Sequence, residues 1–206
     1  MVGRLRDASR ASRPWVIDRI APDFRLLDVW ELPTVGGPDG FDELLLLIAS
    51  LDPLDGSALS RLLFGVRLQL GRWLHWDDSS EQPPIPGTEE RTLRDRLPED
   101  LRTSGQRFTL VKDLQHIAGG FRPLYRTADE AAAELANTTV HGVLHLAWVP
   151  RGDGQYIGQM AVYVKPRGRT GAVYMAVISP FRHLVVYPSL LRQIGRAWDT
   201  RAGTAP

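Results

Sequence analysis

Apolar and polar positions divide the first part of the chain into one predicted strand and two predicted helices. Residues 24–32 (FRLLDVWEL) mix aromatic and aliphatic side chains and end before a proline, which predicts a strand. Residues 41–51 are apolar on nearly every side, which predicts a short buried helix. In residues 59–74, apolar side chains recur at spacings of three and four, the period of an amphipathic helix that Asp55 or Ser57 would cap.

The proline-rich segment 77–90 predicts a long loop, which short strand candidates follow. These candidates are residues 92–97, 107–112 and 121–125. Thr127 and Glu130 then have the spacing of a capping box, with a hydroxyl at the N-cap and a carboxylate three residues later. This pattern predicts an alanine-rich helix that ends at about Ala136.

The last third of the chain predicts three strands and one long helix. The strands are residues 138–149, 156–165 and 172–178, and the glycine-containing loops between them predict an antiparallel meander. Ser179 and Pro180 have the form of a helix start, and Pro188 would kink this helix or begin a new turn. The apolar face of the helix would consist of Phe181, Leu184, Leu191, Ile194 and Trp198.

This order of elements predicts an α+β fold in which a curved antiparallel sheet grips the C-terminal helix, with two short helices after the first strand. We expect one domain over residues 23–198, a flexible N-terminal arm over 1–22 and a tail over 199–206. A gap between such a sheet and its helix is a common place for a small-molecule site. We therefore expect a hollow interior there.

Composition narrows the class of protein. Of 206 residues, 43% are apolar and 24% are charged, which is typical of a globular protein and excludes disordered and fibrous classes. The formal charge of +1 provides no strong field for nucleic acid or an anionic membrane. The absence of cysteine excludes disulfides, thiolate metal sites and cysteine nucleophiles. A bilayer span needs about 20 apolar residues, and no apolar stretch in the sequence approaches that length. The sequence also shows no secretory signal, so it predicts a cytoplasmic protein.

Five stretches carry a resemblance to a known family over about residues 22–198. They are DVWELPT (28–34), TLRDRLPEDL (92–101), NTTVHGVLHLAWV (137–149), GQMAVYVKPRG (158–168) and YMAVISPFRHLVVYPSLLRQIGRAW (174–198). The chain resembles the bacterial family DUF2867, a domain of unknown function from which no activity carries over. Related domains follow short-chain-dehydrogenase-like modules, but this chain has no GxGxxG loop after a strand, so no nicotinamide cofactor is implied. The order of elements is also similar to the START/SRPBCC helix-grip superfamily, which implies a hydrophobic ligand.

His141 and His145 are the candidate catalytic residues. Side chains alternate along a strand, so both histidines share one face, roughly 13 Å apart at ~3.3 Å per residue. That separation is too long for one shared metal ion, but it would let them flank a bound molecule and transfer protons near neutral pH. Glu134 would orient a histidine or act as a base. The alternatives are hydrogen bonds within the fold or exposure to solvent.

Four further side chains are candidates for binding a substrate, namely Tyr163, Arg182, Asp95 and Trp148. Arg182 lies in the first turn of the predicted final helix, where free N–H groups and a guanidinium would together bind an anion. The alternative is a structural pairing of Arg182 with one of three carboxylates, Asp28, Glu31 or Asp95. Asp95 would lie on the apolar side of strand 92–97, where an acid must be paired or functional.

The sequence thus favours a cofactor-independent enzyme that acts on a hydrophobic small molecule by cyclisation, isomerisation or dehydration. No nucleophile elbow, P-loop or metalloprotease motif is present, and we expect no metal or cofactor. One alternative is a carrier or sensor of a hydrophobic ligand, and another is an interaction module that uses the outer side of the last helix. The enzyme hypothesis expects His141→Ala to abolish turnover without changing the thermal midpoint.

Overall fold

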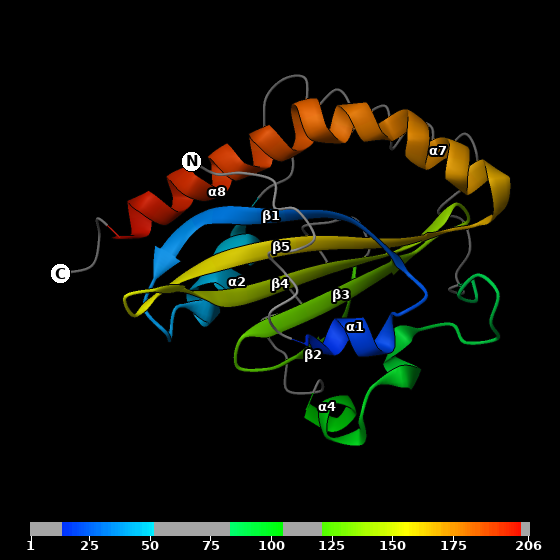
Figure 1. Cartoon of the computed structure of the whole chain (residues 1–206), viewed down its shortest axis with the longest axis horizontal. Coiled ribbons are helices and arrows are strands. Elements are labelled where there is room, and N and C mark those ends of the chain that lie inside the picture. The colour runs from blue at the N-terminus through cyan, green and yellow to red at the C-terminus, as the bar shows by residue number, and fades with distance from the viewer. Residues whose placement is uncertain (1–13, 52–82, 105–120, 203–206) are drawn as a thin grey trace.

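The computed structural model describes residues 14–51, 83–104 and 121–202, which form an antiparallel sheet with helices on both faces (Figure 1). Its five strands lie in the order β1-β5-β4-β3-β2. The strands are β1 (Arg25–Gly36), β2 (Arg122–Arg126), β3 (Glu130–Ala136), β4 (Val140–Gly152) and β5 (Gln155–Pro166). The helices are α1 (Val16–Ile20), α2 (Phe41–Ser50), η2 (Leu93–Arg96), α4 (Glu99–Ser104), α7 (Gly168–Phe181), η4 (Arg182–Val186) and α8 (Tyr187–Ala202). This α+β arrangement is helix-grip-like, as the sequence predicted.

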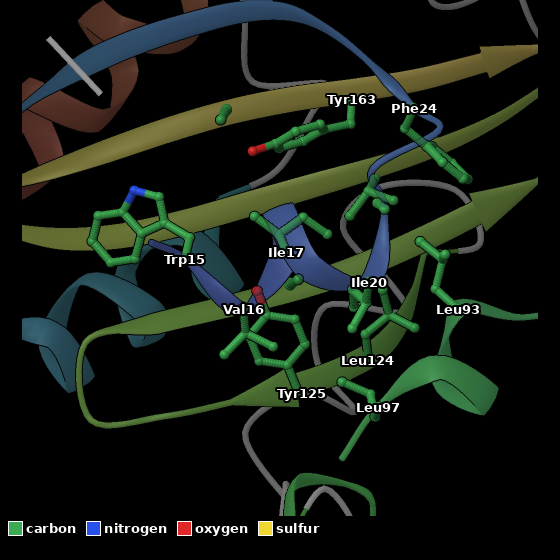
Figure 2. Close-up of a cluster of buried hydrophobic side chains, with 14 of the residues drawn as sticks. Trp15, Val16, Ile17, Ile20, Phe24, Leu93, Leu97, Leu124, Tyr125 and Tyr163 are labelled. Atoms are coloured by element: carbon green, nitrogen blue, oxygen red, sulfur yellow. The ribbon is translucent and has the colours of Figure 1, made fainter. Parts of the chain in front are cut away.

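Both faces of the sheet are buried, each beneath different elements. On the α1 face, α1 and residues 85–97 pack on the strands, and Figure 2 shows the side chains of α1 lying between Tyr163 and Tyr125. On the opposite face, called the α8 face, α2 and α8 pack on β1, β4 and β5. The α8-face cluster includes Leu32, Phe41, Leu44, Leu47, Leu146, Trp148, Met160, Leu191, Ile194 and Trp198. These side chains form an apolar layer between the sheet and the helices α2 and α8. The hollow beneath the C-terminal helix stays a prediction.

Several predicted elements are confirmed. Strand 24–32 is the first part of β1, and strand 121–125 corresponds to β2. Helix 41–51 is α2, and the two strongest strand predictions, 138–149 and 156–165, are β4 and β5. The predicted helix 59–74 and the predicted strand 107–112 lie outside the described residues.

Two predictions in the middle of the chain are wrong. The predicted strand 92–97 is instead the 3₁₀ helix η2, Leu93–Arg96, with the Thr92 hydroxyl accepting from Arg94 N. Residues 130–136 form strand β3 instead of a helix, although their alanine-rich sequence has high helix propensity. The strand wins because β3 pairs with β2 on one side and with β4 on the other. Pairing within the sheet overrides the local preference.

The predicted strand 172–178 is also wrong, because these residues lie inside α7. A short apolar run is compatible with a helix as well as with a strand, so periodicity does not separate the two. The helix starts at Gly168, whose φ of 59° turns the chain sharply after β5. Pro180 lies near the end of α7 instead of opening a helix, and the π-helical turn η4 follows it. One helical run, bent along its length, extends from α7 to α8 (Figure 1).

The N-terminal boundary also differs from the prediction. Residues 16–20, which the sequence assigned to a flexible arm, form α1, and Ile17 and Ile20 are almost fully buried. Because α1 supplies much of the cover on the α1 face, this part of the arm belongs to the core.

Gly171 tests the position of α7. A Cβ at this residue would lie 2.2 Å from the backbone oxygen of Thr139, so Gly171→Ala must displace the start of the helix. We expect this variant to lower the free energy of unfolding by about 1–3 kcal/mol in urea titrations, the usual effect of overpacking. The matched control is Gly37→Ala, since a Cβ at Gly37 has no neighbour within 4 Å. Equal stability of the two variants would contradict the described start of α7.

Candidate functional site

Glu130, at the start of β3, binds three donors on the α1 face. Its carboxylate accepts from Val16 N at 2.9 Å, from the Tyr125 hydroxyl at 3.0 Å and contacts His145 Nε2 at 2.9 Å. Val16 is the first residue of α1, where N–H groups lack partners within the helix. One buried carboxylate therefore joins the start of α1 to β2, β3 and β4.

Glu134 repeats this arrangement four residues later. Its carboxylate accepts from Leu93 N at 3.0 Å and from the Thr92 hydroxyl, and it contacts His141 Nε2 at 2.9 Å. Leu93 is the first residue of η2, so this carboxylate joins a second covering segment to the sheet. Alternation along β3 and β4 places both Glu–His pairs on the same face.

The predicted catalytic residues lie on the face away from α8. His141 and His145 are 0% and 2% exposed and pack edge-on against Phe24 and Trp15, respectively. The expectation that they look into a space beneath the C-terminal helix is therefore wrong, because their face of β4 is covered by α1. The pairing of His141 with Glu134 is present, and a catalytic role for His141, His145 and Glu134 stays a prediction.

The sheet separates the predicted substrate-binding residues. Tyr163 lies on the α1 face, where its hydroxyl donates to Asp18 of α1 at 2.8 Å. Trp148 lies on the α8 face against Trp198. Asp95 is exposed on η2, so the prediction that it lies on an apolar side is wrong. These side chains and the two histidines do not form one pocket.

Arg182 enters a compact charged cluster on the α8 face. Of the three carboxylates proposed as its partner, the structure selects Asp28, which is 2% exposed and forms an ion pair with the Arg182 guanidinium. His183 Nε2 lies 2.7 Å from Asp28 Oδ1, and the Tyr187 hydroxyl donates to Oδ2 at 3.0 Å. The π-helical turn η4 brings Arg182 and His183 to this carboxylate, and such turns recur at functional sites. We call Asp28, Trp30, Arg182, His183 and Tyr187 the Asp28 site.

The charges of the Asp28 site follow from its contacts. Burial alone would raise the pKa of Asp28, but the hydrogen bond from His183, the charge of Arg182 and the hydrogen bond from Tyr187 outweigh it, so this pKa is lowered. His183 Nδ1 lies 2.8 Å from the carbonyl oxygen of Ser179, and its Nε2 faces the ionised Asp28. Both partners only accept, so each ring nitrogen of His183 is satisfied only as a donor, which is the hydrogen-bonding pattern of a doubly protonated ring.

Two buried donors of the Asp28 site have no partner among the described residues, namely Trp30 Nε1 and Arg182 Nε. By contrast, two other tryptophans of this face donate to backbone oxygens, Trp148 to Gly37 at 2.9 Å and Trp198 to Val35 at 3.1 Å. Buried N–H groups are rarely left unpaired, so each such group needs an explanation. His141 Nδ1, on the α1 face, is the third buried atom of this kind.

From the sequence, Asp28 was expected only as one of three possible partners of Arg182, and His183 and Tyr187 were not predicted as site residues. The residues of the site come from two stretches, DVWELPT and FRHLVVY, which meet in the fold. Asp28 and Arg182, one from each stretch, are 154 residues apart in the sequence. Nothing in either stretch indicates which carboxylate and which cation will meet.

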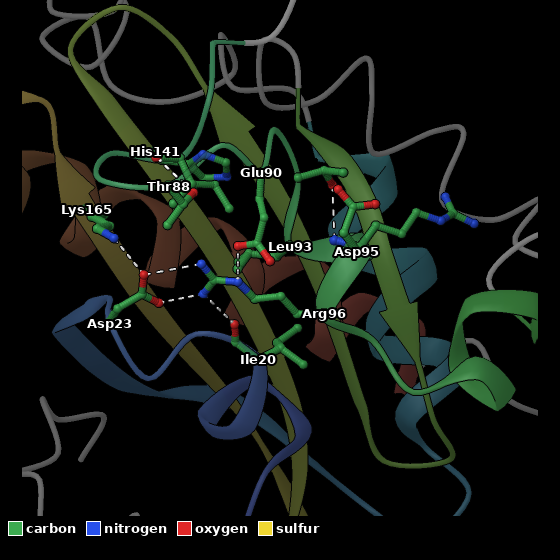
Figure 3. A network of polar contacts seen from close by, with 12 residues as sticks. Ile20, Asp23, Thr88, Glu90, Leu93, Asp95, Arg96, His141 and Lys165 are labelled. Carbon is green, nitrogen blue, oxygen red and sulfur yellow. Dashed lines mark hydrogen bonds and ion pairs between the residues drawn. The ribbon is translucent and has the colours of Figure 1, made fainter.

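A separate ionic network ties α1 to η2 at the surface. In Figure 3 the Arg96 guanidinium lies between Asp23 and Glu90, and Lys165 approaches Asp23 from the other side. Against the opposing effect of burial, the hydrogen bonds from Arg96 and Lys165 lower the pKa of Asp23 to about 2. Arg96 also donates to the carbonyl of Ile20 at 3.1 Å, which closes the end of α1. This network supports the cover of the α1 face.

Within the ranges 14–51, 83–104 and 121–202, no three histidine or acidic residues gather into a site for a metal ion. None of the helices described in these ranges is long and apolar enough to cross a bilayer.

Glu134→Ala tests the role of the Glu–His pairs. The change leaves Leu93 N, the Thr92 hydroxyl and His141 Nε2 without their acceptor, so we expect the free energy of unfolding to fall by about 3 kcal/mol or more. Glu89→Ala removes an exposed carboxylate and should change it by less than about 0.5 kcal/mol. For the same reason His141→Ala should lower the thermal midpoint, in contrast to the expectation from sequence. Wild-type stability of Glu134→Ala in chemical denaturation would show that the pair contributes little.

Acid should unfold the protein through the same carboxylates. Burial opposes ionisation of Glu130, but the hydrogen bonds from His145, Val16 and Tyr125 prevail and lower its pKa. The unfolded chain then binds a proton that the folded chain rejects, so stability is full above about pH 5 and is lost as pH falls through the lowered pKa. Urea titrations from pH 7 to pH 3 should show this decline. Glu130→Gln should flatten it, and an unchanged slope in this variant would contradict the assignment.

The comparisons with known proteins agree with the resemblance seen in the sequence. Neither the search of curated proteins nor the search of solved structures found a match. The model of one family, described as "Protein of unknown function (DUF2867)", matches residues 20–189, a range that contains all five residues of the Asp28 site. The chain therefore belongs to the DUF2867 family.

Proposed function

We propose that this chain is a cofactor-independent enzyme that moves a proton on a small, largely apolar molecule at the Asp28 site. The observation that carries the proposal is one buried carboxylate that contacts a guanidinium, an imidazolium and a phenol together. Such a cluster is weak support for stability, because desolvation of the charges offsets their attraction. Charged groups with shifted pKa values are instead typical of reactive sites.

Each residue has a chemical role in this proposal. His183 shares a proton with Asp28 along the 2.7 Å contact, and its side chain is 25% exposed, so it can reach a ligand. His183 donates this proton to an oxygen of the ligand, and the Asp28–His183 pair regains one from a neighbouring carbon, whose electron pair becomes the new double bond. The net reaction is an isomerisation that needs no oxidant or cofactor. Tyr187 and Arg182 hold the carboxylate in place.

The α1 face offers a second candidate for the base. Glu134 holds Nε2 of His141 while Nδ1 has no partner, which is the arrangement of an oriented histidine base. The His141 side chain is 0% exposed, so a substrate reaches it only when the segments that cover the α1 face move away. At the Asp28 site the side chain of His183 is 25% exposed, and we favour this site for that reason.

Exchange of carbon-bound hydrogen for deuterium tests whether the chain catalyses the proposed proton transfer. Purified full-length chain is incubated in D₂O with acetophenone or 1-tetralone, and deuterium at the carbon next to the carbonyl is followed by mass spectrometry. We expect exchange about 100-fold or more above the protein-free rate, the usual contribution of a placed acid or base. His183→Gln and Asp28→Asn should return the rate to background. Arg192→Lys, at an exposed position of α8, should leave it unchanged.

The same assay separates the alternatives. Loss of exchange in His141→Gln, with full activity in His183→Gln, would move the reaction to the α1 face. Native mass spectrometry of the purified chain gives an independent measure, since a co-purifying organic molecule that is absent from Asp28→Asn would locate binding at this site. Binding without exchange of any probe would identify a carrier or sensor instead of an enzyme.

A further inference from the structure

The two unpartnered donors of the Asp28 site point to the chemistry of the molecule that binds there. We propose that the ligand is an apolar molecule with a carboxylate group, and that Trp30 Nε1 and Arg182 Nε donate to that carboxylate. This inference deepens the proposed function and rests on it for the location of the site.

The first argument is hydrogen-bonding capacity. An indole and a guanidinium have donors and no acceptor, so only an accepting atom can satisfy Trp30 Nε1 and Arg182 Nε. Asp28 is already occupied, because Oδ1 accepts from His183 and Oδ2 accepts from Arg182 Nη2 and Tyr187. The missing acceptor must therefore come from outside this cluster. A carboxylate has two oxygens and can accept more than one hydrogen bond.

The second argument is charge. Within the five residues of the Asp28 site, one anion faces two basic side chains, Arg182 and the doubly protonated His183. The cluster therefore has a net charge of +1 before a ligand binds. An anionic ligand neutralises it in a partly buried place where charge interactions are stronger than in water. A cationic ligand would be repelled, and a neutral ligand would leave the charge unbalanced.

The third argument is the surroundings of the two donors. The Trp30 ring lies 5.0 Å from the Tyr187 ring between centroids, and the Arg182 guanidinium lies 5.7 Å from that same ring. His183 lies 5.7 Å from Tyr187 and 6.4 Å from Trp30. The donors thus border one group of aromatic rings, which favours an apolar and preferably aromatic ligand.

Calorimetric titration of the full-length chain with 1-naphthoate and with neutral 1-naphthylmethanol tests this inference. We expect 1-naphthoate to bind about tenfold or more tightly than the alcohol, because hydrogen bonds to a charged group are the strong ones. Trp30→Phe keeps an aromatic ring and removes Nε1–H, while Arg182→Lys keeps the charge opposite Asp28 and removes Nε–H. Each should weaken binding of 1-naphthoate about tenfold and change binding of the alcohol less than about threefold. Arg192→Lys is the matched control and should bind both like wild type.

Three results would overturn the inference: no binding of 1-naphthoate, equal affinity for the two probes, or undiminished 1-naphthoate binding in Trp30→Phe. Thermal midpoints of all variants are measured in parallel, and Trp30→Phe decides the question if Arg182→Lys fails to fold. The outcome is distinguishable from that of the proposed function. Deuterium exchange without carboxylate preference supports the enzyme and contradicts the carboxylate ligand. A preference for the carboxylate without deuterium exchange supports the carboxylate ligand and contradicts the enzyme.

Discussion

The fold on the α1 face depends on two buried carboxylates, Glu130 and Glu134, each of which accepts from a histidine of β4 and from the first N–H of a short helix. Helices as short as α1 and η2 are not stable alone, because nucleation is unfavourable and few internal bonds follow it. The carboxylates supply acceptors for N–H groups that the helices leave unpaired. A buried acid is tolerated here only because several donors surround it. The same two carboxylates therefore hold His141 and His145 in place and attach α1 and η2 to the sheet.

The Asp28 site also contains a buried carboxylate with several donors, but it differs from the Glu–His pairs in exposure and in its number of unpaired donors. Its carboxylate is as deeply buried as Glu134, at 2% exposure, but its partners Arg182 and His183 keep side-chain exposures of 16% and 25%. Its donors also exceed its acceptors, since two buried N–H groups stay unpaired. The Glu–His pairs are sealed beneath α1 and η2, whereas a partly exposed cluster with two spare donors can bind another molecule. This difference is why we place function on the α8 face.

The turn η4 connects the fold to this site. In an α-helix of regular pitch, consecutive side chains such as Arg182 and His183 point about 100° apart, so both would not reach one carboxylate easily. The π-helical turn widens the helix at these residues, and both side chains contact Asp28 of β1. The bend between α7 and α8 at the same place lets α8 follow β1 while α7 leaves the end of β5 (Figure 1). The π-helical turn η4 therefore serves both the path of the helices and the geometry of the Asp28 site.

The sequence by itself determined the α+β class, the strong strands β4 and β5 and the helix α2, because alternation and helical periodicity are local signals. The pairing of Arg182 with an internal carboxylate was one of two interpretations that the sequence left open. Only the tertiary structure decided that residues 130–136 are a strand, since pairing with β2 and β4 overrode propensity there. It also decided that residues 172–178 belong to a helix, which periodicity did not separate from a strand. It also decided which face His141 and His145 occupy. Both faces of β4 are apolar and buried, so its pattern could not show which covering layer each face meets.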